Sequence, residues 1–180
     1  MTFTIDYIFG AINDELQSEL KEFWDTNRES YRSELRRFKE STTISTINQR
    51  SVFRPLRIQT AATSRDSLGR ITGIVFVALR TLDSELHLGS HAYFQRMYVL
   101  PNHRAPRLSN QLYTTFLREF QNDSLNRDHR ASHLLTENVN PGLRHASMRR
   151  YFARHGFKMV GQNKVKSEIW ALGLKTTFTF

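Results

Sequence analysis

Alternation of apolar and polar residues along several stretches of the chain predicts β-strands. Residues 2–9 alternate in the manner of a half-buried strand. Residues 56–62 and 70–80 flank a turn at 64–69 and predict a hairpin, and the apolar run ITGIVFVAL in its second arm is typical of a buried central strand. The remaining predicted strands are residues 92–100, 133–139, 157–161 and 165–172, of which the last two form an antiparallel pair.

Apolar residues spaced three or four positions apart predict helices between these strands. The first apolar stripe follows Asn13 and Asp14, which suit a helix N-terminus, and the last stripe stops at Gly156, a favourable residue after a helix end. Core packing is the expected role of these stripes. The predicted helices are residues 12–24, 31–38, 108–120 and 140–155.

The resulting order is β, α, α, β, β, β, α, β, α, β, β, which predicts an α/β protein with a mixed, mostly antiparallel sheet flanked by helices. Residues 41–54 are polar and β-branched without a helical period, and they predict a connector close to the substrate side. Neither a repeat nor a convincing linker divides the chain. We therefore expect one domain over residues 1–180.

Composition narrows the possible functions. The chain of 180 residues has no cysteine, which excludes cysteine nucleophiles, thiolate zinc sites and iron–sulfur clusters. Its longest apolar runs are far shorter than the roughly 20 residues that a membrane-spanning helix needs. The first ten residues lack the features of a secretory signal. We expect a soluble, cytoplasmic protein.

Positive charge is concentrated in the second half. Residues 1–90 carry 12 basic and 12 acidic residues, whereas residues 91–180 carry 14 and 5. Clustered positive charge attracts phosphates, so an anionic partner is one interpretation. A solvated basic surface without a specific ligand is the other, and local motifs must decide between them.

Two local motifs lie in this basic half. After a predicted strand, MYVLPNHRAPRLSNQL forms a basic loop that opens a helix, and MRRYFARHGF ends a helix with Tyr151 followed by Gly156 and Phe157. Together with the element order, these motifs resemble the GNAT family of acyl-CoA-dependent N-acyltransferases over about residues 3–172. The family's loop has two glycines where this chain has Arg107 and Ser109.

The resemblance implies acetyl-CoA, or another acyl-CoA, as co-substrate. The pyrophosphate would lie at the helix N-terminus, where unpaired N–H groups and the helix dipole favour anions. Arg104 and Arg107 would add charged contacts in place of the glycines. The cofactor-binding residues implied by the family are the strand backbone at Met97, Tyr98 and Val99, the loop and helix start at Arg104, Arg107, Leu108, Ser109 and Asn110, and Asn140.

The resemblance also implies that Tyr151 acts as the general acid toward the leaving thiolate. An ordinary packed aromatic is the alternative role for this residue. No glutamate lies on the strand before the loop, so Glu137 is the best candidate for a general base, with a structural salt bridge as its alternative. Asn138 and Asn140 are candidates for bonds to substrate, although Asn140 before Pro-Gly also suits a turn or cap.

Several features bear on the acceptor, which the fold does not fix. Basic residues beyond the needs of one CoA suggest DNA, RNA or an acidic protein, and a Pro-Arg-x-Ser loop is similar to that of GNAT-fold proteins that modify phage DNA. The histidine pairs 87/91 and 129/133 lack a completing carboxylate, so no metal is expected. The alternative function is a non-catalytic nucleic-acid- or protein-binding protein on a degenerate GNAT scaffold. The excess basic residues are Arg127, Arg130, Arg144, Arg149, Arg150, Arg154 and Lys158.

Overall fold

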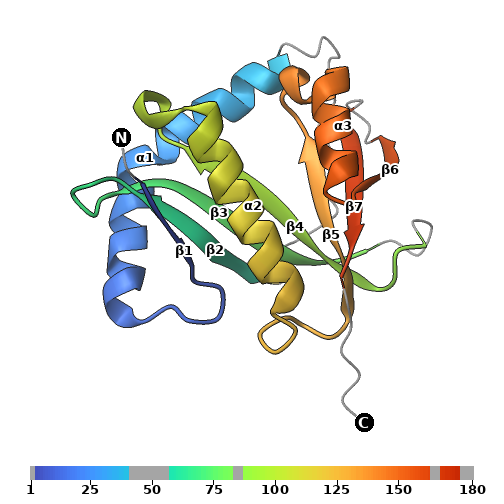
Figure 1. Ribbon diagram of the computed structural model, residues 1–180, viewed down its shortest axis with the longest axis horizontal. Coiled ribbons are helices and arrows are strands. Elements are labelled where there is room, and N and C mark those ends of the chain that lie inside the picture. Colours follow the sequence, from blue (N-terminus) through green and yellow to red (C-terminus); the bar gives the residue numbers. More distant parts are fainter. Residues whose placement is uncertain (1–2, 41–56, 83–86, 163–166, 175–180) are drawn as a thin grey trace.

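The computed structural model describes residues 3–40, 57–82, 87–162 and 167–174, and its described strands form one sheet in the order β1-β2-β3-β4-β5-β7-β6 (Figure 1). Within this sheet only the neighbours β4 and β5 are parallel. The connector predicted over residues 41–54 lies outside the described residues. The strands are β1 (Thr4–Tyr7), β2 (Arg57–Arg65), β3 (Ile71–Thr81), β4 (His91–Val99), β5 (Ala131–Asn138), β6 (Lys158–Gln162) and β7 (Glu168–Gly173).

The first helix corrects the sequence prediction. The helices predicted over residues 12–24 and 31–38 are one continuous helix, α1 (Asp14–Glu40). Its first turn is capped by the Asn13 side chain, which accepts from the Leu16 N–H at 2.9 Å. The polar stretch between the two apolar stripes contains neither Gly nor Pro, so nothing in it ends a helix. Arg28 and Arg32 each form an ion pair with an acidic residue one turn earlier, which supports the helix through this stretch.

A second correction concerns residues 140–155, which were expected to form one helix. The structure has a short 3₁₀ turn, η3 (Pro141–Arg144), and then α3 (Ala146–Arg154). His145 separates them with extended dihedral angles, φ −62° and ψ 148°, which interrupt the helix. The helix end is as predicted, since Gly156 follows it with a φ of +83°. The basic loop contains the 3₁₀ turn η2 (Pro101–His103), and α2 follows (Pro106–Asn122).

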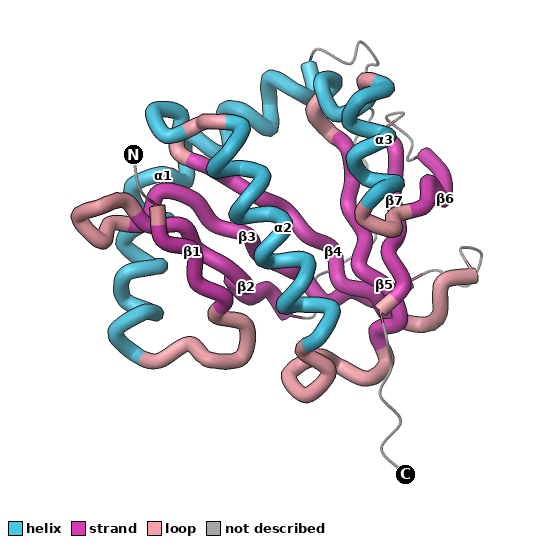
Figure 2. Tube along the Cα trace, viewed as in Figure 1, coloured by secondary structure: helices cyan, strands magenta, loops and turns pink. Residues whose placement is uncertain are grey.

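The helices cover the two faces of the sheet (Figures 1 and 2). Side chains alternate along β3 and β4, so Ile74 and Tyr98 pack with α1, whereas Val75 and Val99 pack with α2 on the opposite face. The α2 face holds the larger core, in which aromatic residues of α2 and α3 meet the sheet. This packing fixes the position of both helices relative to β4 and β5.

The predicted class, a mixed and mostly antiparallel α/β sheet flanked by helices, is confirmed. All predicted strands occur, with bounds that differ by a few residues. In the part of the chain that the structure describes, none of the helices has the length and apolar character required to span a bilayer.

Candidate active site

The parallel strands β4 and β5 separate at one end. They pair from His91 and Ala131 as far as Gln95 and Thr136. Beyond these residues, β4 remains paired only with β3 and β5 only with β7. The sheet therefore opens between the carboxyl ends of its two central strands.

A cavity of about 680 Å³ occupies this opening. Tyr31 and Glu34 line it from α1, on one face of the sheet, and Tyr113 and Tyr151 line it from α2 and α3, on the other. A molecule bound between the strands can consequently contact groups from both faces.

The edge of β4 supplies backbone hydrogen-bonding groups to this opening. The Leu100 N–H donates to the Thr72 carbonyl on the β3 side at 2.8 Å. Because successive residues of an antiparallel strand direct their backbone groups to opposite sides, Met97 and Val99 direct theirs toward the opening. The Val99 carbonyl accepts from Arg104 Nε at 2.9 Å, so the N–H groups of both residues and the Met97 carbonyl face the opening.

The two arginines of the basic loop lie differently. Arg104 forms an ion pair with Glu34 of α1, and its guanidinium lies 5.8 Å from the centre of the Tyr98 ring. The Tyr98 hydroxyl donates to Ser30 Oγ at 3.1 Å, so Arg104 of the loop and Tyr98 of β4 both contact α1. Arg107, in the first turn of α2, is exposed at the surface.

The N-terminus of α2 has the features of an anion site. Ala105 precedes the helix without a side-chain cap, and Pro106 occupies its first position. Proline has no N–H, and the next two amides, of Arg107 and Leu108, have no partner within a helix. The Ser109 N–H donates to the Ala105 carbonyl at 3.0 Å. The free amides, not the buried Leu108 side chain, are thus what this turn offers to an anion.

Tyr151 projects from α3 into the same region. Its hydroxyl donates to Asn110 Oδ1 at 2.8 Å, and both residues line the cavity. Burial raises the pKa of Tyr151. The His155 ring packs with its centre 4.4 Å from that of Tyr151, which restrains the tyrosine. The structure therefore brings together a protonated hydroxyl and the β4 opening.

Glu137 approaches the cavity from the other face of the sheet. Arg96 Nη2 donates to Glu137 Oε2 at 2.8 Å across the separated strands, and both side chains are about two-thirds to three-quarters covered, at 31% and 25% exposure. Burial raises the pKa of nearby Tyr31, with Arg96 opposing that shift. Tyr151 and Glu137 thus line one cavity from opposite sides.

The two asparagines have mainly local partners. Asn138 is fully buried, and its Nδ2 donates to the Leu143 carbonyl at 3.3 Å. Asn140 Oδ1 accepts from the Gly142 N–H at 2.9 Å, which caps the η3 turn, although Asn140 also lines the cavity. Both residues therefore shape the entry to α3.

Sequence reasoning did not single out Gln95, Tyr113, Arg96 or Glu34, all of which line the cavity. Gln95 Nε2 donates to the Tyr113 hydroxyl at 2.6 Å, and burial raises the pKa of Tyr113. The sequence does contain a pattern that could have indicated Gln95. In the strand AYFQRMYVL, alternation places it on the same face as the apolar Tyr93 and Val99. A polar residue at such a position indicates a special role.

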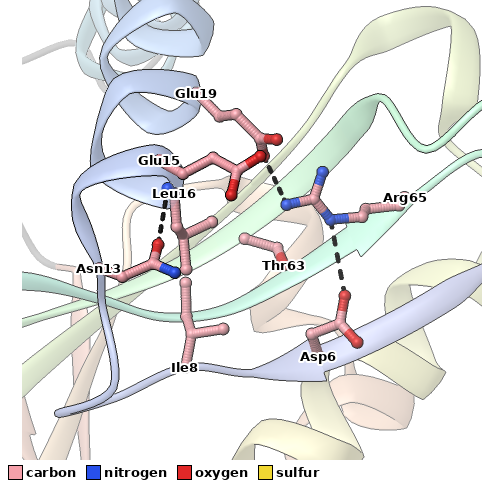
Figure 3. Close-up of a pocket in the computed structure, with 8 residues that line it drawn as sticks. All are labelled: Asp6, Ile8, Asn13, Glu15, Leu16, Glu19, Thr63 and Arg65. Carbon is pink, nitrogen blue, oxygen red and sulfur yellow. Dashed lines mark hydrogen bonds and ion pairs between the residues drawn. The ribbon is translucent and has the colours of Figure 1, made fainter.

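A second, smaller hollow of about 360 Å³ lies between α1 and β2 (Figure 3). Figure 3 shows Arg65 between two carboxylates. Its Nη2 lies 2.6 Å from Glu19 Oε2, and its Nε lies 3.6 Å from Asp6 Oδ2. These charges satisfy one another and join the helix to the sheet. Among the described residues, no group of three or more His, Asp or Glu side chains is placed to hold a metal ion.

Several of the basic residues counted as excess have internal partners. Arg127 is 9% exposed and donates to the Asp123 carbonyl at 2.8 Å. Arg130 pairs with Asp128 at 2.7 Å, and Arg149 pairs with the buried Glu168. Arg127 is therefore not a surface charge, whereas the paired Arg130 and Arg149 remain about half exposed. Further exposed basic residues of this half include Arg107, Arg150, Arg154 and Lys158.

No protein-family model matches this sequence, and no curated protein sequence matches it. Solved structures do resemble it. A GNAT superfamily phosphinothricin acetyltransferase from Sinorhizobium meliloti, in complex with AcCoA, aligns with a TM-score of 0.52 and 12% identity, over 100% of this chain and 93% of that one. A GNAT family acetyltransferase from Staphylococcus aureus aligns with a TM-score of 0.46 and 12% identity, over 97% and 100%. With its diverging central strands and its likeness to the Sinorhizobium meliloti structure, the chain has the fold of the GNAT acyl-CoA N-acyltransferases.

Proposed function

We propose that this protein is an N-acyltransferase that moves an acetyl or other acyl group from acyl-CoA to an amine by direct attack on the thioester. The cavity between β4 and β5 carries this proposal. It has an anion-binding helix N-terminus nearby, an open strand edge along its wall and a protonated tyrosine facing it. A thioester carrier with a diphosphate needs these three features together.

In this proposal the diphosphate binds at the start of α2. The free amides of Arg107 and Leu108 and the exposed Arg107 guanidinium supply the contacts. Ser109 lines the cavity and adds a hydroxyl. Arg104 contributes less directly, because its guanidinium already binds Glu34 and the Val99 carbonyl.

The pantetheine arm lies along the open edge of β4. The arm is extended, and each of its amides has one hydrogen-bond donor and one acceptor. These can bond to the N–H and C=O of Met97 and the N–H of Val99. These backbone groups would otherwise face the cavity without a strand partner. Tyr98 directs its backbone toward β3 and acts through its side chain against α1.

The reaction follows from the two faces of the cavity. A neutral amine attacks the thioester carbonyl carbon, a C–N bond forms, and the carbon–sulfur bond breaks in the resulting intermediate. Glu137 takes the proton from the nitrogen, directly or through a water. The leaving thiolate takes a proton from Tyr151, whose raised pKa keeps it protonated at neutral pH. Products are an amide and CoA.

Binding and turnover test the proposal separately. Isothermal titration with acetyl-CoA and with desulfo-CoA measures the donor site, and release of free thiol in the presence of amines measures transfer. Binding of both ligands, with thiol release only from acetyl-CoA, supports the function. No binding up to millimolar concentrations rejects it. Native mass spectrometry of the purified protein adds a direct search for retained CoA or nucleic acid.

The acceptor proposed is an amine on a polyanion, either a nucleic acid or an acidic protein. The exposed Arg150 and Arg154 on α3 support this choice, because they are separate from the α2 N-terminus that serves CoA. Fluorescence anisotropy with labelled DNA and RNA at increasing salt tests it. Salt-dependent binding without any binding of CoA would favour the alternative, a non-catalytic binding protein on this scaffold.

A further inference from the structure

A buried polar pair lies where the opening between β4 and β5 closes. Gln95 is the last residue of β4 that pairs with β5, and Gln95 and Tyr113 are 4% and 8% exposed. Gln95 Nε2 donates to the Tyr113 hydroxyl at 2.6 Å. Both side chains line the cavity. They are a polar part of a cavity lining that is otherwise mainly aromatic and aliphatic on this face.

This pair has unused hydrogen-bonding capacity. Gln95 Oε1 is buried and has no partner among the described residues. The Tyr113 hydroxyl accepts in its bond to Gln95, so its own hydrogen is not used in that bond. If the amide were turned over, Oε1 would accept from Tyr113 and Nε2 would be left without a partner instead. In either orientation one buried polar group of Gln95 lacks a hydrogen-bond partner. Such a group costs free energy unless a molecule in the cavity bonds to it.

The position of this pair relative to an acyl donor rests on the proposed function. The arm enters at the start of α2 and passes Val99 and then Met97 along the open edge of β4. Gln95 is the next residue on that side, and the strands close there at the Gln95–Thr136 pair. The acyl end, farthest from the phosphates, therefore lies against Gln95 and Tyr113.

We propose that the acyl group transferred by this protein is short and carries a hydroxyl. A hydroxyl donates one hydrogen bond and accepts others, so it satisfies both Gln95 Oε1 and the Tyr113 O–H. An acetyl methyl group satisfies neither, and an ammonium group donates to Gln95 but accepts nothing from Tyr113. The selectivity resides in this chain's own side chains, not in the backbone groups that hold the arm.

Three donors that differ in one terminal group test this inference. Glycolyl-CoA, glycyl-CoA and propionyl-CoA end in a hydroxyl, an ammonium and a methyl group, and isothermal titration gives the dissociation constant of each, with CoA as reference. We expect glycolyl-CoA to bind about tenfold more tightly than propionyl-CoA, which is within the range expected for two net hydrogen bonds. Glycyl-CoA is expected between them. Gln95→Met should abolish the difference without changing the affinity for CoA.

The matched control is Gln111→Met, the same change at an exposed glutamine of α2. It should retain the full preference for glycolyl-CoA. If Gln95→Met does not fold, Tyr113→Phe and the wild-type series still decide the question. Wild-type binding of propionyl-CoA as tight as that of glycolyl-CoA overturns the hydroxyl preference alone. Failure of CoA itself to bind overturns the proposed function and this inference with it.

Discussion

The hydroxyl of Tyr151 donates a 2.8 Å hydrogen bond to Asn110 Oδ1, and this bond joins α3 to α2 at the wall of the cavity. It fixes the position of the hydroxyl at this wall. Burial raises the pKa of the same group, so the proton is retained at neutral pH. An acid must have both properties, a fixed direction and a proton to give.

Replacement of Tyr151 by phenylalanine should lower kcat roughly a hundredfold, a typical contribution of a general acid. The dissociation constant of acetyl-CoA should change little, because the ring remains. Thiol release and isothermal titration measure the two quantities. Tyr7→Phe is the matched control. Tyr7 lies in β1, outside the cavity wall, and its hydroxyl donates to Asp123 Oδ2 at 2.9 Å. Full turnover by the Tyr151 variant would remove its assignment as the acid.

The pH dependence of turnover follows from the direction of the Tyr151 shift. The acid acts in its protonated form, and a raised pKa extends that form above the ordinary tyrosine value of about 10. The ratio of wild-type to Tyr151→Phe kcat should therefore stay constant from pH 7 to about pH 10. A ratio that declines between pH 7 and 9 would contradict the raised pKa.

Arg107→Ala should weaken binding of acetyl-CoA about tenfold, because one charge-assisted contact to phosphate is lost. The effect should shrink in high salt, since the side chain is exposed. Arg118→Ala serves as control on the same helix, where Arg118 pairs with Glu119 at 2.6 Å. Equal affinities of the two variants would place the phosphates elsewhere.

Glu137→Gln should lower kcat at neutral pH by about 10²-fold and leave acetyl-CoA binding near the wild-type value. The amide cannot take a proton from the attacking amine, yet it keeps the shape of the side chain beside Arg96. Glu119→Gln, a paired glutamate on α2 outside the cavity wall, controls for loss of a charge. If turnover of the Glu137 variant is unchanged, Glu137 is not the general base and its role is structural, as in its salt bridge to Arg96.

Stability at alkaline pH should depend on the buried tyrosines. Burial raises the pKa of Tyr113 and of Tyr7, and the Asp123 carboxylate adds to the shift of Tyr7. In the unfolded chain a tyrosine ionises near pH 10, whereas the folded state holds the proton to higher pH. Their contribution is therefore fully present below about pH 10 and is lost as pH rises above it. Urea unfolding at pH 8 and pH 11 should show this loss, and Tyr7→Phe should reduce it.

The sequence predicted most of the architecture because its signals are local. The stripe that includes Leu112 and Phe116 defines α2, and the Tyr151 to Gly156 spacing defines the end of α3, both of which the structure contains. The same reasoning divided α1 in two, because it took a polar stretch for a break although no residue in it disfavours a helix.

The charged and polar pairs of the candidate site lie beyond such reasoning. Arg104 meets Glu34 across 70 positions and Arg96 meets Glu137 across 41, and neither contact follows a helical or strand period. Each depends on the tertiary arrangement, in which β4 lies beside β5 and α1 packs over β3 and β4. Sequence reasoning also took Arg127 for a surface charge. In the structure its guanidinium carbon lies 5.8 Å from the centre of the Phe120 ring, and its nitrogens donate to the Asp123 and Gln121 carbonyls.

The cavity between β4 and β5 extends from the α1 side of the sheet to the α2 side. In the proposed reaction, donor and acceptor then occupy this cavity at the same time. The chain has no cysteine to hold the acyl group between two half-reactions. Double-reciprocal rate plots at several donor concentrations should accordingly intersect, as for a ternary complex, and not run parallel.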